Sequence, residues 1–96
     1  QPALVEAFIS GPEFTVTLIG NDPPSVLPAV QRALDPETRI GIHALEGPGR
    51  EAVTPRGSPI TPGRLEPALE ERLAALALRA FAALECRDFA RIDFRL

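Results

Sequence analysis

One amphipathic stretch, residues 65–84, constrains the fold of this chain more than any other feature, because its apolar residues recur at helical spacing. A stripe with steps of three and four residues is typical of a helix that packs one face on a partner. The stripe consists of Leu65, Leu69, Leu73, Leu76, Ala80 and Leu84, widened by Ala77 and Phe81. Thr61 is the expected N-cap, and Pro67 fits only in a first turn. The rest of the chain must supply the surface that this helix covers.

The segments around the helix are typical of strands. Residues 3–9 alternate in side-chain character, Ser10-Gly11-Pro12 is turn chemistry, and residues 13–20 (EFTVTLIG) alternate again with many β-branched residues. These two runs predict an antiparallel hairpin. Residues 26–30 form a short third strand at a sheet edge, because Pro28 cannot donate to a ladder. Residues 88–96 form a last strand. The predicted fold class is α+β: an antiparallel sheet with one long helix packed on it.

Glycine and proline crowd residues 34–63 and leave no room there for a regular element, so we expect a long loop within a single domain of residues 1–96. Loops of this length in compact domains are usually functional or mobile. Because the chain begins Gln1-Pro2-Ala3, contains no methionine and ends within a strand-like segment, we expect it to be an excerpt of a longer protein.

Composition excludes several classes of protein. One cysteine cannot form an internal disulfide framework, and a net charge of -3 gives no electrostatic reason to expect nucleic acid as a partner. The longest apolar stretch, residues 73–84, is interrupted by Arg79, so we expect no membrane span, and no secretory signal is visible at the start.

The last strand carries the sharpest group of candidate functional residues. Period-2 alternation places Phe89, Arg91, Asp93 and Arg95 on one face, and Ala90, Ile92, Phe94 and Leu96 on the face toward the helix. Arg91 and Asp93 would lie roughly 6.6 Å apart along the strand. A cation and a carboxylate so placed can stabilise an anion and ligate Mg²⁺. The alternative is a solvated, self-paired outer face, since alternating charge on strands is ordinary.

Glu6 and Glu13 are a second pair of candidates. Their carboxylates could accept hydrogen bonds from the hydroxyls or the amine of a ligand, or they could be charges that protect a sheet edge. His43, the only histidine, lacks a metal-ligand pattern and is interpreted as a loop residue. Cys86 is interpreted as a small buried apolar group.

Two segments resemble a known family. VEAFISGPEFTV (residues 5–16) resembles the "VE-x-(F/W)-(I/L)-x-G-x-E-(F/Y)-(T/S)-V" segment of D-alanine–D-alanine ligases. ALECRDFARIDFRL (residues 83–96) resembles the "alG-x-x-g/d-(Y/F)-aR-(V/I)-D" segment of the same ATP-grasp ligases. The two segments occur in the order found in that family, separated by a loop and a helix.

The resemblance implies a role for each candidate residue. Glu6 would meet the adenine amino group of ATP, and the backbone at Phe8 and Ile9 would read the adenine edge. Glu13 would bind the ribose hydroxyls. Arg91 would stabilise the oxyanions of the reaction, and Asp93 would hold Mg²⁺.

The resemblance further implies a cytoplasmic, Mg²⁺-dependent carboxylate–amine ligase of peptidoglycan biosynthesis, with small-molecule substrates such as D-alanine and a homodimeric parent protein. This chain would supply only part of the ATP and Mg²⁺ site, so the fragment alone is expected to be inactive. Another ATP-grasp amino-acid or peptide ligase is the nearest alternative.

A degenerate ATP-grasp module that binds nucleotide or a partner without catalysis is an alternative from another class. The family normally carries a lysine that helps with phosphates, in the region where this chain has residues 40–46 (IGIHALE), and this chain contains no lysine at all. The substrate-lid tyrosine of the family is also missing, and these gaps bear on D-alanine specificity.

Overall fold

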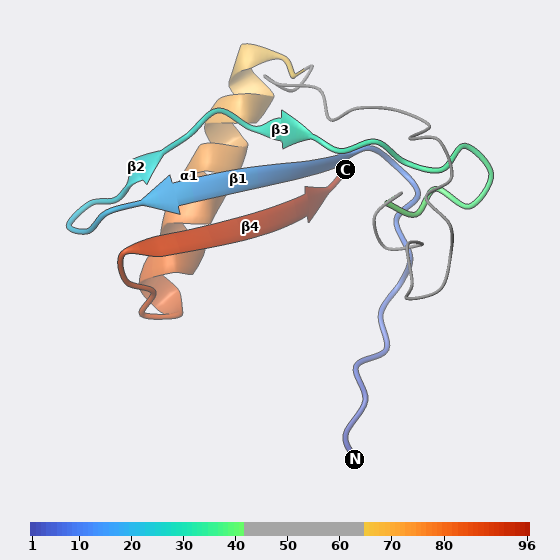
Figure 1. The fold of residues 1–96 in the computed structure, drawn as a ribbon, viewed down its shortest axis with the longest axis horizontal. Helices are drawn as coiled ribbons and strands as arrows, with labels where there is room; N and C mark the ends of the chain where they lie inside the picture. Colours follow the sequence, from blue (N-terminus) through green and yellow to red (C-terminus); the bar gives the residue numbers. More distant parts are fainter. Residues whose placement is uncertain (42–64) are drawn as a thin grey trace, which may run out of the picture.

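A computed structural model describes residues 1–41 and 65–96 of the chain. Within them, four strands form one antiparallel sheet, and a single helix crosses one face of that sheet (Figure 1). The expected α+β class is therefore confirmed. His43 lies outside the described residues, as does most of the expected loop over residues 34–63. The expected N-cap at Thr61 is wrong, because the helix begins at Pro67 and its N-cap is Glu66, whose side chain makes no capping hydrogen bond.

Strand β1, Glu13–Ile19, is the centre of the sheet. On one side it pairs along its whole length with β4, Phe89–Arg95, from Glu13 opposite Arg95 to Ile19 opposite Phe89. On its other side it pairs with β2, Ser25–Val26, and then with β3, Val30–Gln31. Both edges of β1 are thus occupied.

The edge strand expected over residues 26–30 is present but interrupted. Leu18 pairs with Val26 and Thr15 pairs with Val30, while Pro28 lies between the two short strands and joins neither. A proline has no N–H to donate, so the ladder stops and resumes around it.

The hairpin expected between residues 3–9 and 13–20 is wrong in its first half. Residues 1–10 form no strand and are exposed throughout, with Leu4 and Val5 almost fully so. The alternation in this segment is real, but a strand needs a neighbour to satisfy its backbone groups. The segment cannot pair with β1, since β4 and the β2–β3 strand already occupy both of its edges.

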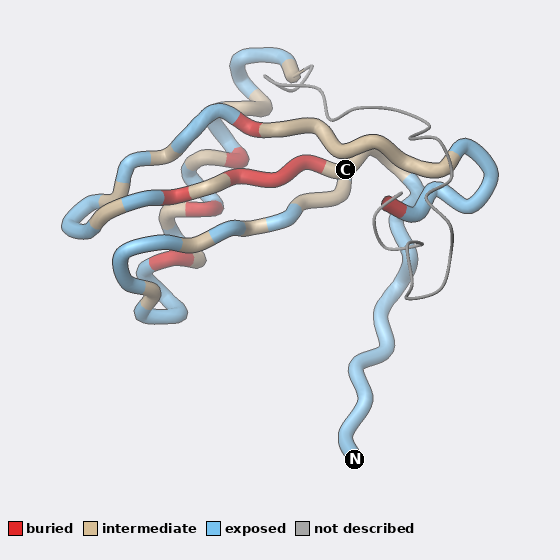
Figure 2. Tube along the Cα trace, in the orientation of Figure 1, coloured by how far each residue is buried: buried red, intermediate tan, exposed pale blue. Residues whose placement is uncertain are grey.

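The core lies between the sheet and helix α1, Pro67–Ala83 (Figure 2). Its buried side chains come from the inner face of β1 and one stripe of α1: Phe14, Val16, Leu18, Leu73, Ala77 and Phe81, together with Ala29. The predicted stripe was too broad. Leu76 is 45% exposed and Leu84 75% exposed, because the helix turns the narrower 73–77–81 line toward the sheet.

The end of α1 follows a Schellman motif, which carries the chain into β4. The N–H of Cys86 donates to the carbonyl of Phe81 (2.9 Å), and the N–H of Glu85 donates to the carbonyl of Ala82 (3.1 Å). Glu85 has a φ of 54°, so the left-handed conformation predicted at this position is confirmed. Cys86 packs against the core as an apolar group, but it is only partly buried and not buried as expected.

Among the described residues, no helix is both long and apolar enough to cross a membrane.

Candidate functional site

The sheet face opposite α1 gathers the polar residues of the two longest strands. Because side chains alternate along a strand, every second residue of β1 points to this outer face, opposite its partner on β4. Three cross-strand pairs result: Glu13 with Arg95, Thr15 with Asp93, and Thr17 with Arg91. The predicted alternation of β4 is confirmed, since Ala90, Ile92 and Phe94 pack against the core on the other side.

Asp93 is held by a neighbour on each side. The Oγ1 of Thr15 donates a hydrogen bond of 2.8 Å to Asp93 Oδ1, and the Nε of Arg91 lies 3.6 Å from the same oxygen. The carboxylate remains 42% exposed. Within residues 1–41 and 65–96 no other group bonds it, so Oδ2 is free to accept from a ligand or to bind a cation.

Arg91 approaches Asp93 through Nε only, and its side chain is 56% exposed. The two terminal nitrogens of its guanidinium therefore remain for an anionic ligand, since nothing else in the described part of the chain bonds them. An exposed pair at this distance stabilises the fold by little, about 0–1 kcal/mol. The pairing is also the one expected of a self-paired outer face, the alternative that the sequence left open.

The position of Glu13 excludes one of its two sequence interpretations, the edge charge. Glu13 opens the central strand, so it is not an edge charge, and its side chain is only 16% exposed. Arg95 Nη2 donates to Glu13 Oε2 at 2.9 Å, and Arg32 Nε lies 3.8 Å from Oε1. The carboxylate is thus held in place through Oε2. Since a carboxylate oxygen has two acceptor sites, Oε1 keeps the capacity to accept from a ligand hydroxyl.

Glu6, Phe8 and Ile9 lie in the exposed N-terminal segment and not in the sheet. Phe8 contacts the site residues indirectly, since the guanidinium carbon of Arg95 stands 5.2 Å from the centroid of its ring. Glu6 belongs to the exposed N-terminal segment, residues 1–10, which runs away from the sheet (Figure 1). The structure therefore brings Glu13, Arg91 and Asp93 onto one face but does not bring Glu6 to them.

The described residues fit a Mg²⁺ site to which this chain contributes one carboxylate ligand, Asp93. In the described part of the chain no three acidic, histidine or cysteine side chains cluster as a metal site. Mg²⁺ in proteins is commonly held by one or two carboxylates together with substrate phosphates and waters. Asp93, with its free Oδ2 and a hydrogen-bonded Oδ1, meets that requirement for one carboxylate.

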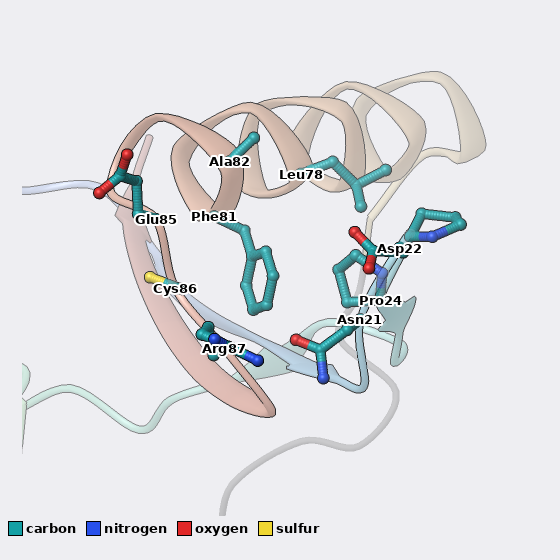
Figure 3. A pocket seen from close by; sticks show the side chains of 10 residues that line it. Asn21, Asp22, Pro24, Leu78, Phe81, Ala82, Glu85, Cys86 and Arg87 are labelled. Atoms are coloured by element: carbon teal, nitrogen blue, oxygen red, sulfur yellow. The ribbon is translucent and has the colours of Figure 1, made fainter.

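A separate cleft opens at the C-terminal end of α1, where the turn between β1 and β2 faces Phe81, Glu85 and Arg87 (Figure 3). Asn21, one of the residues that line the cleft, makes two hydrogen bonds with Asp88, of 2.9 and 3.0 Å. This cleft lies at the opposite end of β1 from Glu13 and includes none of the predicted site residues.

Two residues of the site carried no predicted role. Thr15 could have been found by alternation, because it lies two residues from Glu13 on the same face. The alternation of the last strand predicts Arg95 on the charged face. It does not predict the contacts of Arg95, because these join segments that are far apart in the sequence.

Comparison with known proteins adds a family. The model of the family described as D-ala D-ala ligase C-terminus matches residues 1–96. The D-alanine–D-alanine ligase of Desulforudis audaxviator (strain MP104C) is 38% identical over 90 residues, which cover 94% of this chain and 27% of that protein. That of Desulforamulus reducens (strain ATCC BAA-1160 / DSM 100696 / MI-1) is 31% identical over 94 residues, covering 98% of this chain and 28% of that protein.

An uncharacterized protein, y4sG of Sinorhizobium fredii (strain NBRC 101917 / NGR234), is 39% identical over 96 residues. These cover 100% of this chain and 28% of y4sG. The chain therefore spans little more than a quarter of the length of these relatives.

Proposed function

Since the chain belongs to the family of D-alanine–D-alanine ligase C-terminal domains, we propose that it supplies part of the ATP and Mg²⁺ site of a carboxylate–amine ligase. The longer protein that would carry the complete site is called the parent below. The observation that carries the proposal is the pairing of Arg91 with Asp93 on the exposed sheet face, with Thr15 holding the carboxylate.

The proposed reaction has two steps. A substrate carboxylate oxygen attacks the γ-phosphorus of ATP, which forms an acyl phosphate and releases ADP. The amine of the second substrate then attacks the acyl carbon, and the resulting tetrahedral intermediate expels inorganic phosphate to leave an amide; the proton of the amine passes to solvent or a base. Negative charge develops on oxygen in both steps, so donors fixed in advance at those oxygens lower the barrier.

Arg91 is the proposed donor to these oxyanions. Its Nε lies 3.6 Å from Asp93 Oδ1, its side chain is 56% exposed, and no group of the described residues bonds its terminal nitrogens. A planar fork of donors suits carboxylate and phosphate oxygens, because it can bond two of them at once.

Asp93 is the proposed carboxylate ligand of Mg²⁺, which when bound would neutralise charge on the phosphates of ATP. Oδ2 would be the ligating atom, since Thr15 and Arg91 both approach Oδ1. A hydrogen bond from a neighbouring side chain to a ligating carboxylate is a common way to fix its orientation.

Nucleotide recognition is assigned to the opposite end of the same two strands. Glu13 would accept from the ribose hydroxyls through Oε1, and the extended segment that contains Glu6, Phe8 and Ile9 would contact the adenine. These assignments rest on the resemblance of residues 5–16 to the family motif and on the position of Glu13 on the Arg91–Asp93 face.

A non-catalytic, nucleotide-binding module is the second candidate. It is favoured by one observation: all basic residues of the chain are arginine, so the lysine expected near the phosphates is missing. A D-alanine substrate and a cytoplasmic location belong to the first candidate and are proposed with it.

One assay separates the two candidates. Release of ADP by the parent, measured with and without Mg²⁺, a carboxylate and an amine, should require all three if the parent is a ligase. Calorimetric binding of ATP without any ADP release would support the non-catalytic module instead.

A further inference from the structure

We infer that Arg95 is a positioning residue that fixes the proposed ribose acceptor, Glu13, and the start of the adenine segment against the end of β4. The inference rests on the proposed function, because it concerns how the same site is held together. It assigns a role to a side chain that has no expected contact with the nucleotide.

The contacts of Arg95 join three segments of the chain. Its Nη2 donates to Glu13 Oε2 at 2.9 Å, and its Nη1 donates to the carbonyl oxygens of Arg39 at 2.7 Å and Gly11 at 3.3 Å. Its guanidinium also stands over the ring of Phe8, 5.2 Å from the centroid. Both terminal nitrogens are therefore directed into the protein and not toward a ligand.

The Arg95–Glu13 pair is more buried than an ordinary surface ion pair. The side chains of Arg95 and Glu13 are only 20% and 16% exposed, whereas those of Arg91 and Asp93 on the same strand are about half exposed. Partly buried charges are screened less by water and salt than exposed ones. The Glu13 carboxylate is thus held through Oε2 while Oε1 remains for a ligand.

Neighbouring contacts fix the same segment. Arg39 Nε donates to the carbonyl of Ser10 at 3.0 Å, and the N–H of Leu96 donates to the carbonyl of Pro12 at 3.1 Å. A side chain at Gly11 would collide with the backbone carbonyl of Leu96, so the segment passes β4 at the closest approach that a glycine allows.

The geometry therefore gives Arg95 a definite place in the site. It lies two residues from Asp93 and bonds the carboxylate that would receive the ribose. Loss of its planar fork would leave Glu13 with the longer Arg32 contact alone, and would remove the contacts that Arg95 makes with Gly11 and Phe8.

The test measures nucleotide preference in the parent by calorimetry, with ATP and with 2′,3′-dideoxy-ATP, which lacks the ribose hydroxyls. If the ribose hydroxyls donate to the Glu13 carboxylate, the wild-type protein should bind ATP about tenfold to hundredfold more tightly than 2′,3′-dideoxy-ATP. We expect Glu13→Gln and Arg95→Gln each to remove most of that preference. The double variant should lose little more, since both changes disable one unit.

Two further variants sharpen the comparison. Arg95→Lys keeps the charge and most of the stem but not the fork, so it should also lose the preference. It decides the question if Arg95→Gln does not fold. Arg79→Gln, on the exposed side of α1, is the matched control and should keep the wild-type preference.

Steady-state kinetics give a second readout that a purely structural role would not produce. In Arg95→Lys the KM for ATP should rise about tenfold or more while kcat at saturating ATP stays within about threefold, because the lost interaction is made equally in the ground and transition states.

The outcomes are distinguishable. If the wild-type parent prefers ATP and the Arg95 variants keep that preference, the role of Arg95 is wrong and the proposed function stands. If the wild-type parent does not bind ATP, the proposed function fails and the role of Arg95 fails with it. A collapse of the preference in the Arg95 variants alone, with the Arg79 control unchanged, supports the inference.

Discussion

Thr15 Oγ1 donates a 2.8 Å hydrogen bond to Asp93 Oδ1 across the β1–β4 pair, although the two residues are 78 positions apart in the sequence. Thr15 is the only polar residue among the buried side chains of the described structure, at 8% exposed. Its hydroxyl donates to the Asp93 carboxylate. The bond leaves Asp93 with one oriented oxygen and one free oxygen, which suits a carboxylate that ligates a cation.

Thr15→Val should therefore impair the site while leaving the sheet intact. Valine has nearly the shape of threonine and favours strands, but it cannot donate to Asp93. Loss of an outer hydrogen bond of this kind typically lowers metal affinity or activity about 10- to 100-fold. The check is the Mg²⁺ concentration that gives half-maximal ADP release by the parent, which should rise.

Thr17→Val is the matched control for that measurement. Thr17 lies on the same face, opposite Arg91, and makes no side-chain hydrogen bond to the residues the structure describes. An equal shift in both variants would mean that the hydroxyl of Thr15 has no particular role at Asp93.

A lysine at position 91 should not replace Arg91 in catalysis, so Arg91→Lys should lower kcat. A single preorganised donor to an oxyanion contributes about 3–4 kcal/mol to the transition state, so loss of the fork should reduce kcat roughly 10²- to 10³-fold. Circular dichroism should be unchanged, because the Arg91–Asp93 pair is half exposed and contributes little to stability. A Lys variant near the wild-type rate would make Arg91 a structural residue, and Arg79→Lys on α1 controls for the change in side chain.

Glu85→Gly should stabilise the parent. Glu85 has a φ of 54° at the position after the helix end, where glycine meets no Cβ penalty. The expected gain is about 0.5–1 kcal/mol in the free energy of unfolding, read from the urea midpoint. Glu71→Gly, within α1 and exposed, is the control and should destabilise by about 1 kcal/mol. Destabilisation by Glu85→Gly would contradict the strain argument.

The parts of the fold that the sequence predicted correctly depend on local rules. The alternation of β4 places Arg91 and Asp93 on one face whatever the strand pairs with, and the end of a helix favours a left-handed residue wherever it occurs. Both features are present in the structure.

The features that the sequence did not predict depend on which segments meet. Residues 3–9 alternate like a strand, yet both edges of β1 are occupied by other strands. The stripe of α1 allowed two adjacent lines of apolar residues, and only the position of the helix on the sheet selects Leu73 and Phe81 over Leu76 and Leu84. The contacts of Arg95 likewise require three distant segments to be placed first.

Asp93→Asn in the parent tests the central claim most directly. Asparagine keeps the size of the side chain and can still accept from Thr15, but it removes the negative charge that would bind Mg²⁺. The measurement is the rate of Mg²⁺-dependent ADP release with carboxylate and amine present. We predict a fall of orders of magnitude with an unchanged melting temperature. Turnover equal to that of the wild-type protein would remove Asp93 from the site.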